Sequence, residues 1–415
     1  MNSDTKTLSS LSRPELLLLF LLAMVQFTHI MDFMIVMPMG PQLMRLFDIT
    51  PRQFGFLVSA YTYTAGITGI AGAFFIDRFD RKTALLIAYI GFAVGTLACA
   101  IAPDYGFLLM ARSLAGAFGG VLGALIFSVV GDAISFEKRG RAMGIVMASF
   151  SMASVLGVPT GIYLATRVSW HAPFVLVGAV AIVNLILLFF FMKPMRGHLM
   201  SREDRPHPVT VLRGIASDRN QVLALLFMIF MMMSQFLLIP FFSPSMVANV
   251  GFEETDLPYI YFFGGFMTIF TSPLVGRMAD KFGKAPVFTI AAVLLLAPCL
   301  IITHLGPTPM WVALLVTTAF FICGNARFIP AMAMITSTVK PATRGSFMSI
   351  NSSVQSLSSG TAALIGGLIV EKGINGELLY YNRLGYLSVG LSLVAIYLGR
   401  KLKPVDANAP PASKA

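Results

Sequence analysis

Two residues with acid–base chemistry lie in one long apolar segment near the start of the chain. The segment runs from about residue 16 to 38 and contains His29 and Asp32. Asp32 is the only acidic residue that falls deep inside an apolar segment. An ionised carboxylate is costly in hydrocarbon, so such groups usually face a bundle interior or a water-filled cavity and mark an ion pathway. We therefore expect the chain to build a cavity around Asp32.

Arg112 is the basic group whose expected depth matches that of Asp32. Asp32 lies six residues before Pro38, and Arg112 lies six residues after Gly106. At ~1.5 Å per residue, both charges lie about 9 Å from the same membrane surface. A carboxylate and a guanidinium at one depth relieve each other's desolvation cost, and protonation of the carboxylate would release the arginine. The alternative is a static pair that orients two helices.

His29 precedes Asp32 by one helical turn and roughly shares its face. Imidazole titrates near neutral pH, so His29 could relay a proton to Asp32. The alternative is a hydrogen-bonded packing group, which is the commoner role for a lone histidine in a span. We predict proton coupling by Asp32, Arg112 and His29.

The composition indicates a membrane protein. Of the 415 residues, 56% are hydrophobic and only 12% are charged, too few to cover a soluble protein of this length. Apolar segments of about 20 residues recur, each able to cross a ~30 Å hydrocarbon core, and they lack the alternation of barrel strands. Three cysteines, Cys99, Cys299 and Cys323, fall in such segments, so we expect neither disulfides nor a metal site.

We predict an all-α polytopic membrane protein with twelve transmembrane helices. The first apolar segment is read as a retained span, not as a signal peptide. The expected domains are a six-helix half at 1–192, a cytoplasmic loop at 193–220, a second half at 221–402 and a tail at 403–415. The spans lie at about 16–38, 53–76, 83–102, 106–130, 142–165, 172–192, 221–243, 257–276, 285–303, 310–335, 345–370 and 384–400.

Basic residues are divided unequally between the two sides of the predicted membrane. Most of the 30 Lys and Arg residues lie in the tails, the central loop and the loops that follow even-numbered spans. The opposite loops carry only Arg45, Arg52, Arg167, Lys372 and Arg383. This asymmetry predicts that both termini are cytoplasmic. The net charge of +11 therefore reflects topology, and nucleic acid is not an expected partner.

The two halves of the chain repeat. Asp77 and Asp280 differ by 203 positions, as do Pro41 and Pro244. Six spans return the chain to the same side, so the repeats are parallel and related by an axis along the membrane normal. We therefore expect two pseudo-symmetric six-helix halves with a substrate site between them near the midplane.

The chain resembles the Major Facilitator Superfamily (MFS) along roughly residues 14–402. Within it, the chain is most similar to the bacterial drug and sugar efflux branch, which includes the arabinose-efflux-permease-like group. The family pattern G-x-L-x-D-R-x-G-R-K is matched after span 2 by Asp77, Arg78, Arg81 and Lys82, with Ala73 and Asp80 in place of the glycines. The copy after span 8 has Gly276, Asp280, Gly283 and Lys284.

These two loops are expected to form a cytoplasmic latch. Asp77 could meet the positive N-terminus of a helix in the other half, and Arg81 could bridge to Asp132 or Glu137. Topology alone does not require the same aspartate twice, but marking topology is the alternative role. Asp80 tolerates a left-handed turn better than most residues, so the loop geometry could survive without the glycine.

Two further elements carry the resemblance. The segment Arg112–Gly116 is similar to the family's R-x-x-x-G element, with Ala115 where Gln is common, and this implies a part for Arg112 in proton transfer. In span 5, Gly157, Pro159 and Gly161 resemble the G-P-x-x-G element of efflux members, with the proline moved by one. The resemblance implies that this element lies between the halves. Ordinary helix packing is the alternative.

At the position that corresponds to the charged Asp32 of the first half, the second half has a neutral polar residue. The offset of 203 places Gln235 at the repeat position of Asp32. Arg327 could meet an anionic substrate, close an inner gate, or form a static bond to backbone carbonyls. The residues expected to line the substrate cavity are Gln235, Tyr259, Tyr261, Asn325 and Arg327.

The sequence contains no phosphate loop and no H-E-x-x-H motif, so neither an enzyme nor a cofactor is expected. We expect a monomer in the bacterial inner membrane that exports a small sugar-like or drug-like molecule by proton antiport and alternating access. Two readings stay open. One is a proton symporter or facilitator that imports a metabolite. The other is a membrane sensor or lipid-handling protein on the same fold.

Overall fold

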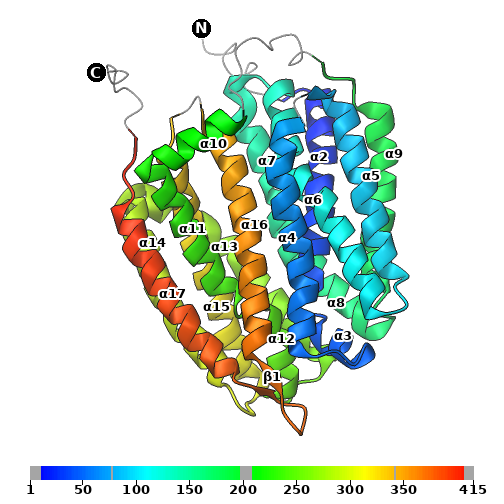
Figure 1. The fold of residues 1–415 in the computed structure, drawn as a ribbon, viewed down its shortest axis with the longest axis vertical. Coiled ribbons are helices and arrows are strands. Elements are labelled where there is room, and N and C mark those ends of the chain that lie inside the picture. The colour runs from blue at the N-terminus through cyan, green and yellow to red at the C-terminus, as the bar shows by residue number, and fades with distance from the viewer. Residues whose placement is uncertain (1–10, 76–77, 197–207, 341–342, 406–415) are drawn as a thin grey trace.

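Helices dominate the structure. The computed structural model describes residues 11–75, 78–196, 208–340 and 343–405, and within these ranges the only sheet is one pair of two-residue strands. The long helices run roughly along the long axis of the molecule, in two bundles that meet at α4 (Pro51–Phe75) and α16 (Arg344–Ile369) (Figure 1).

The first bundle contains the expected six spans, the fifth of which is interrupted. Short helices follow the first span and precede the fifth. Its elements besides α4 are α2 (Arg13–Ile35), α3 (Gly40–Leu46), α5 (Arg81–Ala100), α6 (Tyr105–Ala133), η2 (Phe136–Lys138), α7 (Arg139–Met152), η3 (Ala153–Gly157), α8 (Val158–Arg167) and α9 (Ala172–Phe191).

The second bundle repeats this order after a short amphipathic helix. Its elements besides α16 are α10 (Pro208–Ser217), α11 (Arg219–Phe236), α12 (Ile239–Ala248), η6 (Glu254–Asp256), α13 (Leu257–Phe282), α14 (Lys284–His304), α15 (Met310–Ser337), β1 (Glu371–Lys372), β2 (Leu378–Leu379) and α17 (Tyr381–Lys401). The strands pair antiparallel, with Glu371 opposite Leu379.

The predicted all-α fold with twelve long helical spans is confirmed, and ten of the predicted spans each coincide with one helix to within about six residues. The fifth is divided among α7, η3 and α8, and the seventh runs past the end of α11 into α12. Nine helical segments in the described ranges are long and apolar enough to cross a membrane. The helices α4, α16 and α17 have the length but are less apolar. For α4 and α16 the physical reason is their position, because each buries small and polar residues against the other.

Polar caps fix where several helices begin. Ser12 and Glu15 form a reciprocal capping box at the start of α2. The Asp104 carboxylate accepts a hydrogen bond from the Phe107 amide at 2.9 Å and so starts α6. Such caps satisfy the backbone donors that a helix leaves free at its N-terminus.

The first span ends earlier than predicted. A turn follows Ile35, and Pro41 stands in the first turn of the short helix α3, where a proline lacks no needed donor. Asp32 is therefore about one turn from the end of α2, and not six residues inside a helix that continues to Pro38.

Small residues let α4 and α16 approach closely. A Cβ atom on Gly55 would lie 2.8 Å from the Ala363 carbonyl oxygen, so only glycine fits there. Ser59 donates to the Gly360 carbonyl oxygen at 2.8 Å, and the hydroxyls of Tyr63 and Thr361 are 3.0 Å apart. Small residues and interhelical hydrogen bonds are the usual means by which helices associate in lipid. This seam joins the two bundles.

The two bundles share a hydrophobic core at one end only. We call this the α12 end, because it carries α3, α12 and β1, and we call the opposite end the α10 end (Figure 1). At the α12 end, residues such as Phe54 of the first half and Phe241 of the second belong to one buried cluster. Toward the α10 end, each half has its own cluster, one including Leu125 and one including Met228.

Space around helical glycines shows the same asymmetry. A Cβ atom on Gly144 of α7, Gly276 of α13 or Gly345 of α16 would meet no described atom within 4 Å. A Cβ on Gly40 of α3 would instead lie 2.8 Å from Pro244 of α12. The halves are therefore closely packed at the α12 end and looser at the α10 end.

Candidate functional site

Asp32 and Arg112 form an ion pair in the interior of the first half. The Arg112 Nη1 atom lies 2.7 Å from the Asp32 Oδ2 atom, and their side chains are 1% and 0% exposed. The same nitrogen donates to the Asp32 carbonyl oxygen at 3.2 Å. A buried pair of this kind is costly to break, because removing one partner leaves an uncompensated charge. It joins α2 to α6.

Several aromatic side chains pack around this pair. The Arg112 Cζ atom lies 4.3 Å from the centre of the Tyr61 ring, so the guanidinium lies over the ring face. The Tyr61 ring stacks on Phe33 and on His29, with centroids 5.6 and 6.3 Å apart. His29 also contacts Phe92 edge-on at 6.0 Å.

Several polar atoms near the pair are buried without a hydrogen-bond partner among the described residues. They are His29 Nδ1, Asp32 Oδ1, Tyr61 Oη and Arg112 Nε. Buried polar groups are normally hydrogen-bonded, and such groups in a native protein call for an explanation such as a catalytic or transport role.

The second half contains a corresponding contact between spans 7 and 10. Arg327 of α15 is 1% exposed and donates to Gln235 Oε1 at 3.2 Å and to the Met231 carbonyl oxygen at 3.0 Å, both on α11. Ser392 of α17 accepts a third hydrogen bond at 3.3 Å. Gln235 thus contacts an arginine as Asp32 does, but the partners of Arg327 are neutral.

Of the remaining residues predicted for the substrate cavity, Tyr261 and Asn325 have partners of their own. The Tyr261 hydroxyl lies 2.9 Å from the Ser243 hydroxyl, and Asn325 donates to Ser272 at 3.0 Å. Tyr259 is 58% exposed near the start of α13. In this conformation the structure brings Gln235 to Arg327, while Tyr261 and Asn325 bond to other residues and Tyr259 is exposed.

The predicted span 5 element coincides with a break in helical geometry. The π-helical turn η3 ends at Gly157, and Pro159 follows in the first turn of α8. A Cβ on Gly161 would lie 2.3 Å from the Ile35 side chain, so this glycine allows close packing on α2 of the same half. Contact with the other half is made at Gly265 of α13, whose Cβ would lie 3.1 Å from the Ser154 carbonyl oxygen.

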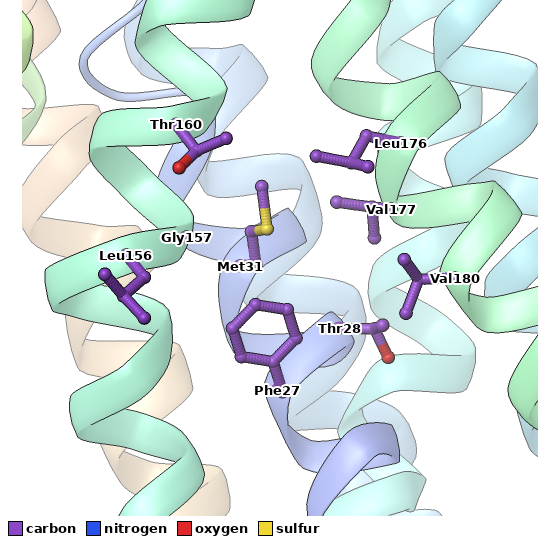
Figure 2. Close-up of a pocket in the computed structure, with 9 residues that line it drawn as sticks. All are labelled: Phe27, Thr28, Met31, Leu156, Gly157, Thr160, Leu176, Val177 and Val180. Carbon is purple, nitrogen blue, oxygen red and sulfur yellow. The ribbon is translucent and has the colours of Figure 1, made fainter.

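An apolar crevice of about 220 Å³ lies beside this break, between α2, η3, α8 and α9 (Figure 2). Met31 and Phe27 lie between the side chains of α8 and those of α9 in this view. Apart from Gly157, the crevice contains none of the predicted site residues. It is lined by Phe27, Thr28, Met31, Leu156, Gly157, Thr160, Leu176, Val177 and Val180.

The predicted latch residues make contacts within their own half where the structure gives them. The Arg81 Nε atom lies 2.9 Å from Asp132, which is one of the two bridges expected from the sequence. Lys82 donates to the Phe189 carbonyl oxygen at 2.7 Å. Glu137 is exposed, as is Asp280. Asp77 lies outside the described residues, and so do the surroundings of the Ala73 side chain.

The two latch loops differ in backbone geometry. Gly283 has a φ of +92°, in the region that favours glycine. Asp80 has a φ of −53° and caps α5 by accepting a hydrogen bond from the Lys82 amide at 2.9 Å. The expectation that Asp80 would substitute for glycine in a left-handed turn is therefore wrong, because the residue serves as a helix cap. Arg78 and Lys284 are exposed at the ends of these loops, and Gly276 lies within α13.

Two contacts of functional interest involve residues to which the sequence assigned no role. Tyr61 lies under the guanidinium, and its only sequence signal is an aromatic side chain in a span. Arg45 of α3 binds Glu254 of η6 through two hydrogen bonds of 2.5 and 3.2 Å, across the two halves at the α12 end. The signal for that pair is a basic and an acidic residue on the side that has few basic residues.

Sequence comparison agrees with the fold. Residues 22–329 and 224–415 match the Major Facilitator Superfamily. The uncharacterized MFS-type transporter YbcL of Bacillus subtilis is 22% identical over 94% of this chain and 97% of its own length. The inner membrane transport protein YdhP of Escherichia coli K12 is 23% identical, over 88% and 92%. Multidrug resistance protein 2 of Bacillus subtilis is 20% identical, over 93% and 96%.

Solved structures share the architecture. A nucleoside transporter, NupG, superposes with a TM-score of 0.75 at 13% identity over 94% of this chain and all of that chain. A D-xylose-proton symporter superposes with a TM-score of 0.73 at 17% identity, over 94% and 99%. The chain belongs to the Major Facilitator Superfamily. It is a multi-pass membrane protein that carries out secondary transport, not an enzyme.

Proposed function

We propose that the protein is a proton-coupled antiporter that exports a small organic molecule. The observation that carries this proposal is the Asp32–Arg112 pair, a titratable carboxyl buried against a fixed cation in a membrane-spanning bundle. Ionisable residues at such positions in transporters usually belong to ion or proton pathways. The relative named Multidrug resistance protein 2, similar along 93% of the chain, supports efflux of a drug-like compound.

The coupling step follows from the charges of the pair. When Asp32 binds a proton, the carboxyl becomes neutral and the charge attraction that holds Arg112 is lost. The contact between α2 and α6 then weakens, which changes the packing of the two helices. Release of the proton restores the pair. His29, one turn away on α2, is proposed to pass protons to and from Asp32 through its free Nδ1 atom.

Alternating access would use the asymmetry between the two ends. We propose that the α10 end faces the cytoplasm, because the loops at that end carry most of the Lys and Arg residues, and that both termini lie on this side. The shared core at the α12 end then closes the outer side, and the separate cores leave the inner side accessible. The loops around Arg81 and Asp280 would close the inner side in the opposite state.

The second half is proposed to supply neutral and cationic contacts for substrate. Gln235 and Arg327 lie together, Asn325 lies on α15 with Arg327, and Tyr259 and Tyr261 lie on the neighbouring helix α13. Movement of α11 against α15 would expose the Gln235 amide and the Arg327 guanidinium to the space between the halves. Their hydrogen bonds would bind a polar or anionic group of the substrate.

Transport by purified protein in proteoliposomes tests the proposal. Counterflow should first be measured with a panel of pentoses, hexoses and lipophilic cations such as tetraphenylphosphonium. A compound that exchanges should then accumulate on the side of higher proton concentration when a pH difference is imposed. Accumulation on the other side would indicate symport, and exchange without any response to the pH difference would indicate a facilitator.

A further inference from the structure

The Arg112 guanidinium has two partners of different kinds. One is the Asp32 carboxylate at 2.7 Å, whose charge disappears when the group is protonated. The other is the face of Tyr61, 4.3 Å away, whose attraction for a cation does not depend on the proton. A cation over an aromatic face is held more strongly when it is desolvated than when it is exposed to water.

The Tyr61 ring is held in place from several sides. It is 2% exposed and stacks on Phe33 and His29 of α2. A Cβ on Gly116 of α6 would lie 2.3 Å from the Tyr61 carbonyl oxygen, and a Cβ on Gly119 would lie 2.7 Å from its hydroxyl. The two glycines therefore let α6 pack directly on Tyr61. This packing fixes the ring beneath Arg112, which also lies on α6.

Tyr61 also lies beside the seam between the halves. Two residues before it, Ser59 donates to Gly360 of α16, and two residues after it, Tyr63 contacts Thr361. Among the described helices of the first half, α4 makes the most extensive contact with the second half. A displacement of the Tyr61 ring would therefore be transmitted to α4, the helix that contacts the other half.

We propose that Tyr61 is a positioning residue that retains the Arg112 guanidinium when Asp32 is protonated. The inference rests on the proposed role of Asp32 as proton acceptor. In the ion-paired state the carboxylate fixes the position of the guanidinium, whereas in the protonated state the guanidinium can settle fully on the ring face, so the ring stabilises the protonated state more than the ion-paired one. Loss of the ring therefore makes protonation of Asp32 harder and shifts it to lower pH.

The charged and titratable groups that face Asp32 come from each helix around it. They are Arg112 on α6, Tyr61 on α4, Cys99 on α5 and His29 on α2 itself. The α8 and α9 side chains that meet this part of α2 at the crevice are apolar apart from Thr160. A titration must therefore separate Asp32 from His29 and Cys99.

Infrared difference spectroscopy of the protein in proteoliposomes provides this separation and needs no substrate. The stretch of a protonated carboxyl that titrates in the wild type and is absent in Asp32→Asn belongs to Asp32. If no band is lost in Asp32→Asn, both this inference and the proposed proton site are wrong. If the band is present, its midpoint can be compared between variants of Tyr61.

We expect Tyr61→Leu to move the midpoint to lower pH by about one unit, which is a tenfold change in the protonation equilibrium. Tyr61→Phe keeps the ring face and should leave the midpoint within a few tenths of a unit of the wild type. Tyr61→Met, whose unbranched side chain adapts to the space of the ring without offering an aromatic face, should behave as Tyr61→Leu does and serves if that variant fails to fold. An unshifted midpoint in the folded non-aromatic variant would overturn the proposal. So would an equal shift in Tyr61→Phe.

Discussion

Arg45 and Glu254 connect the two halves of the molecule at the α12 end. The Arg45 Nη1 atom lies 2.5 Å from the Glu254 Oε1 atom, with side chains 66% and 15% exposed. A second hydrogen bond, from Nη2 to Oε2 at 3.2 Å, makes the contact bidentate. Since Arg45 follows the first span and Glu254 precedes the eighth, the pair must separate if this end opens during transport.

Neutralising Arg45 should favour opening of the α12 end. Arg45→Gln removes an exposed pair worth about 0.2–1 kcal/mol, so the open fraction should rise by up to about fivefold. Spin labels at Leu46→Cys and Ile374→Cys, both exposed and on opposite halves, would report the separation. Arg52→Gln is the matched control, because Arg52 lies at the same end over the Phe56 ring. Equal effects of the two variants would contradict a specific role for the pair.

The pH dependence of this contact follows from Arg45. The hydrogen bond from Arg45 to Glu254 raises the pKa of the Arg45 guanidinium above its ordinary value. Because this pKa is raised, the stabilisation by Arg45 is fully present at any pH below the ordinary pKa of arginine. The stabilisation is lost only when the pH rises past the raised pKa. We expect the label distances to stay unchanged between pH 7 and pH 9. Opening within that interval would show that another group controls this end.

Glycine at position 120 should be required for the packing of α6 on α4. A Cβ at Gly120 would lie 2.1 Å from the Ala65 carbonyl oxygen, which is rigid backbone, whereas a Cβ at Gly123 meets no described atom within 4 Å. Gly120→Ala should lower the free energy of unfolding by about 1–3 kcal/mol through overpacking. Gly123→Ala on the same helix should be neutral or slightly stabilising. Thermal unfolding in detergent compares them, and similar losses in both would refute the close approach.

Gln235 should matter for stability as well as for substrate. Gln235→Leu removes an acceptor from the buried Arg327 guanidinium and should lower the unfolding free energy by about 1–3 kcal/mol. Gln235→Glu keeps an acceptor at the same position and is the control. Under the proposed function, Gln235→Leu also weakens substrate binding without moving the pH profile of transport. A moved pH profile with unchanged affinity would show that ion and substrate sites are not divided between the halves.

The sequence predicted the elements and contacts whose alternatives carry a large free-energy cost. The spans follow from long apolar runs, and contact between Asp32 and Arg112 follows from the penalty on two lone charges in hydrocarbon. For Arg81 the sequence predicts a bridge to an acidic group at the end of span 4, either Asp132 or Glu137, and the structure shows Asp132. In each case a strong physical cost leaves few alternative arrangements.

For other contacts, no comparable free-energy cost can be read from the sequence. Tyr61 is one of 11 tyrosines, and an amphipathic aromatic residue in a span has many acceptable neighbours. Arg45 and Glu254 are 209 positions apart and partly exposed, so only tertiary packing brings them together. The end of α2 at Ile35 was missed because the apolar run continues into the turn before Pro38.

Proton-driven transport by Asp32→Asn tests the central claim most directly. The measurement is uptake of an exchanged compound into proteoliposomes with and without an imposed pH difference, for the wild type and the variant. Asp32→Asn keeps a side chain of similar shape but has no carboxyl to titrate. The account predicts that the variant still exchanges substrate but no longer concentrates it when the pH difference is applied. Accumulation at the wild-type level by Asp32→Asn would contradict the claim that Asp32 couples transport to protons.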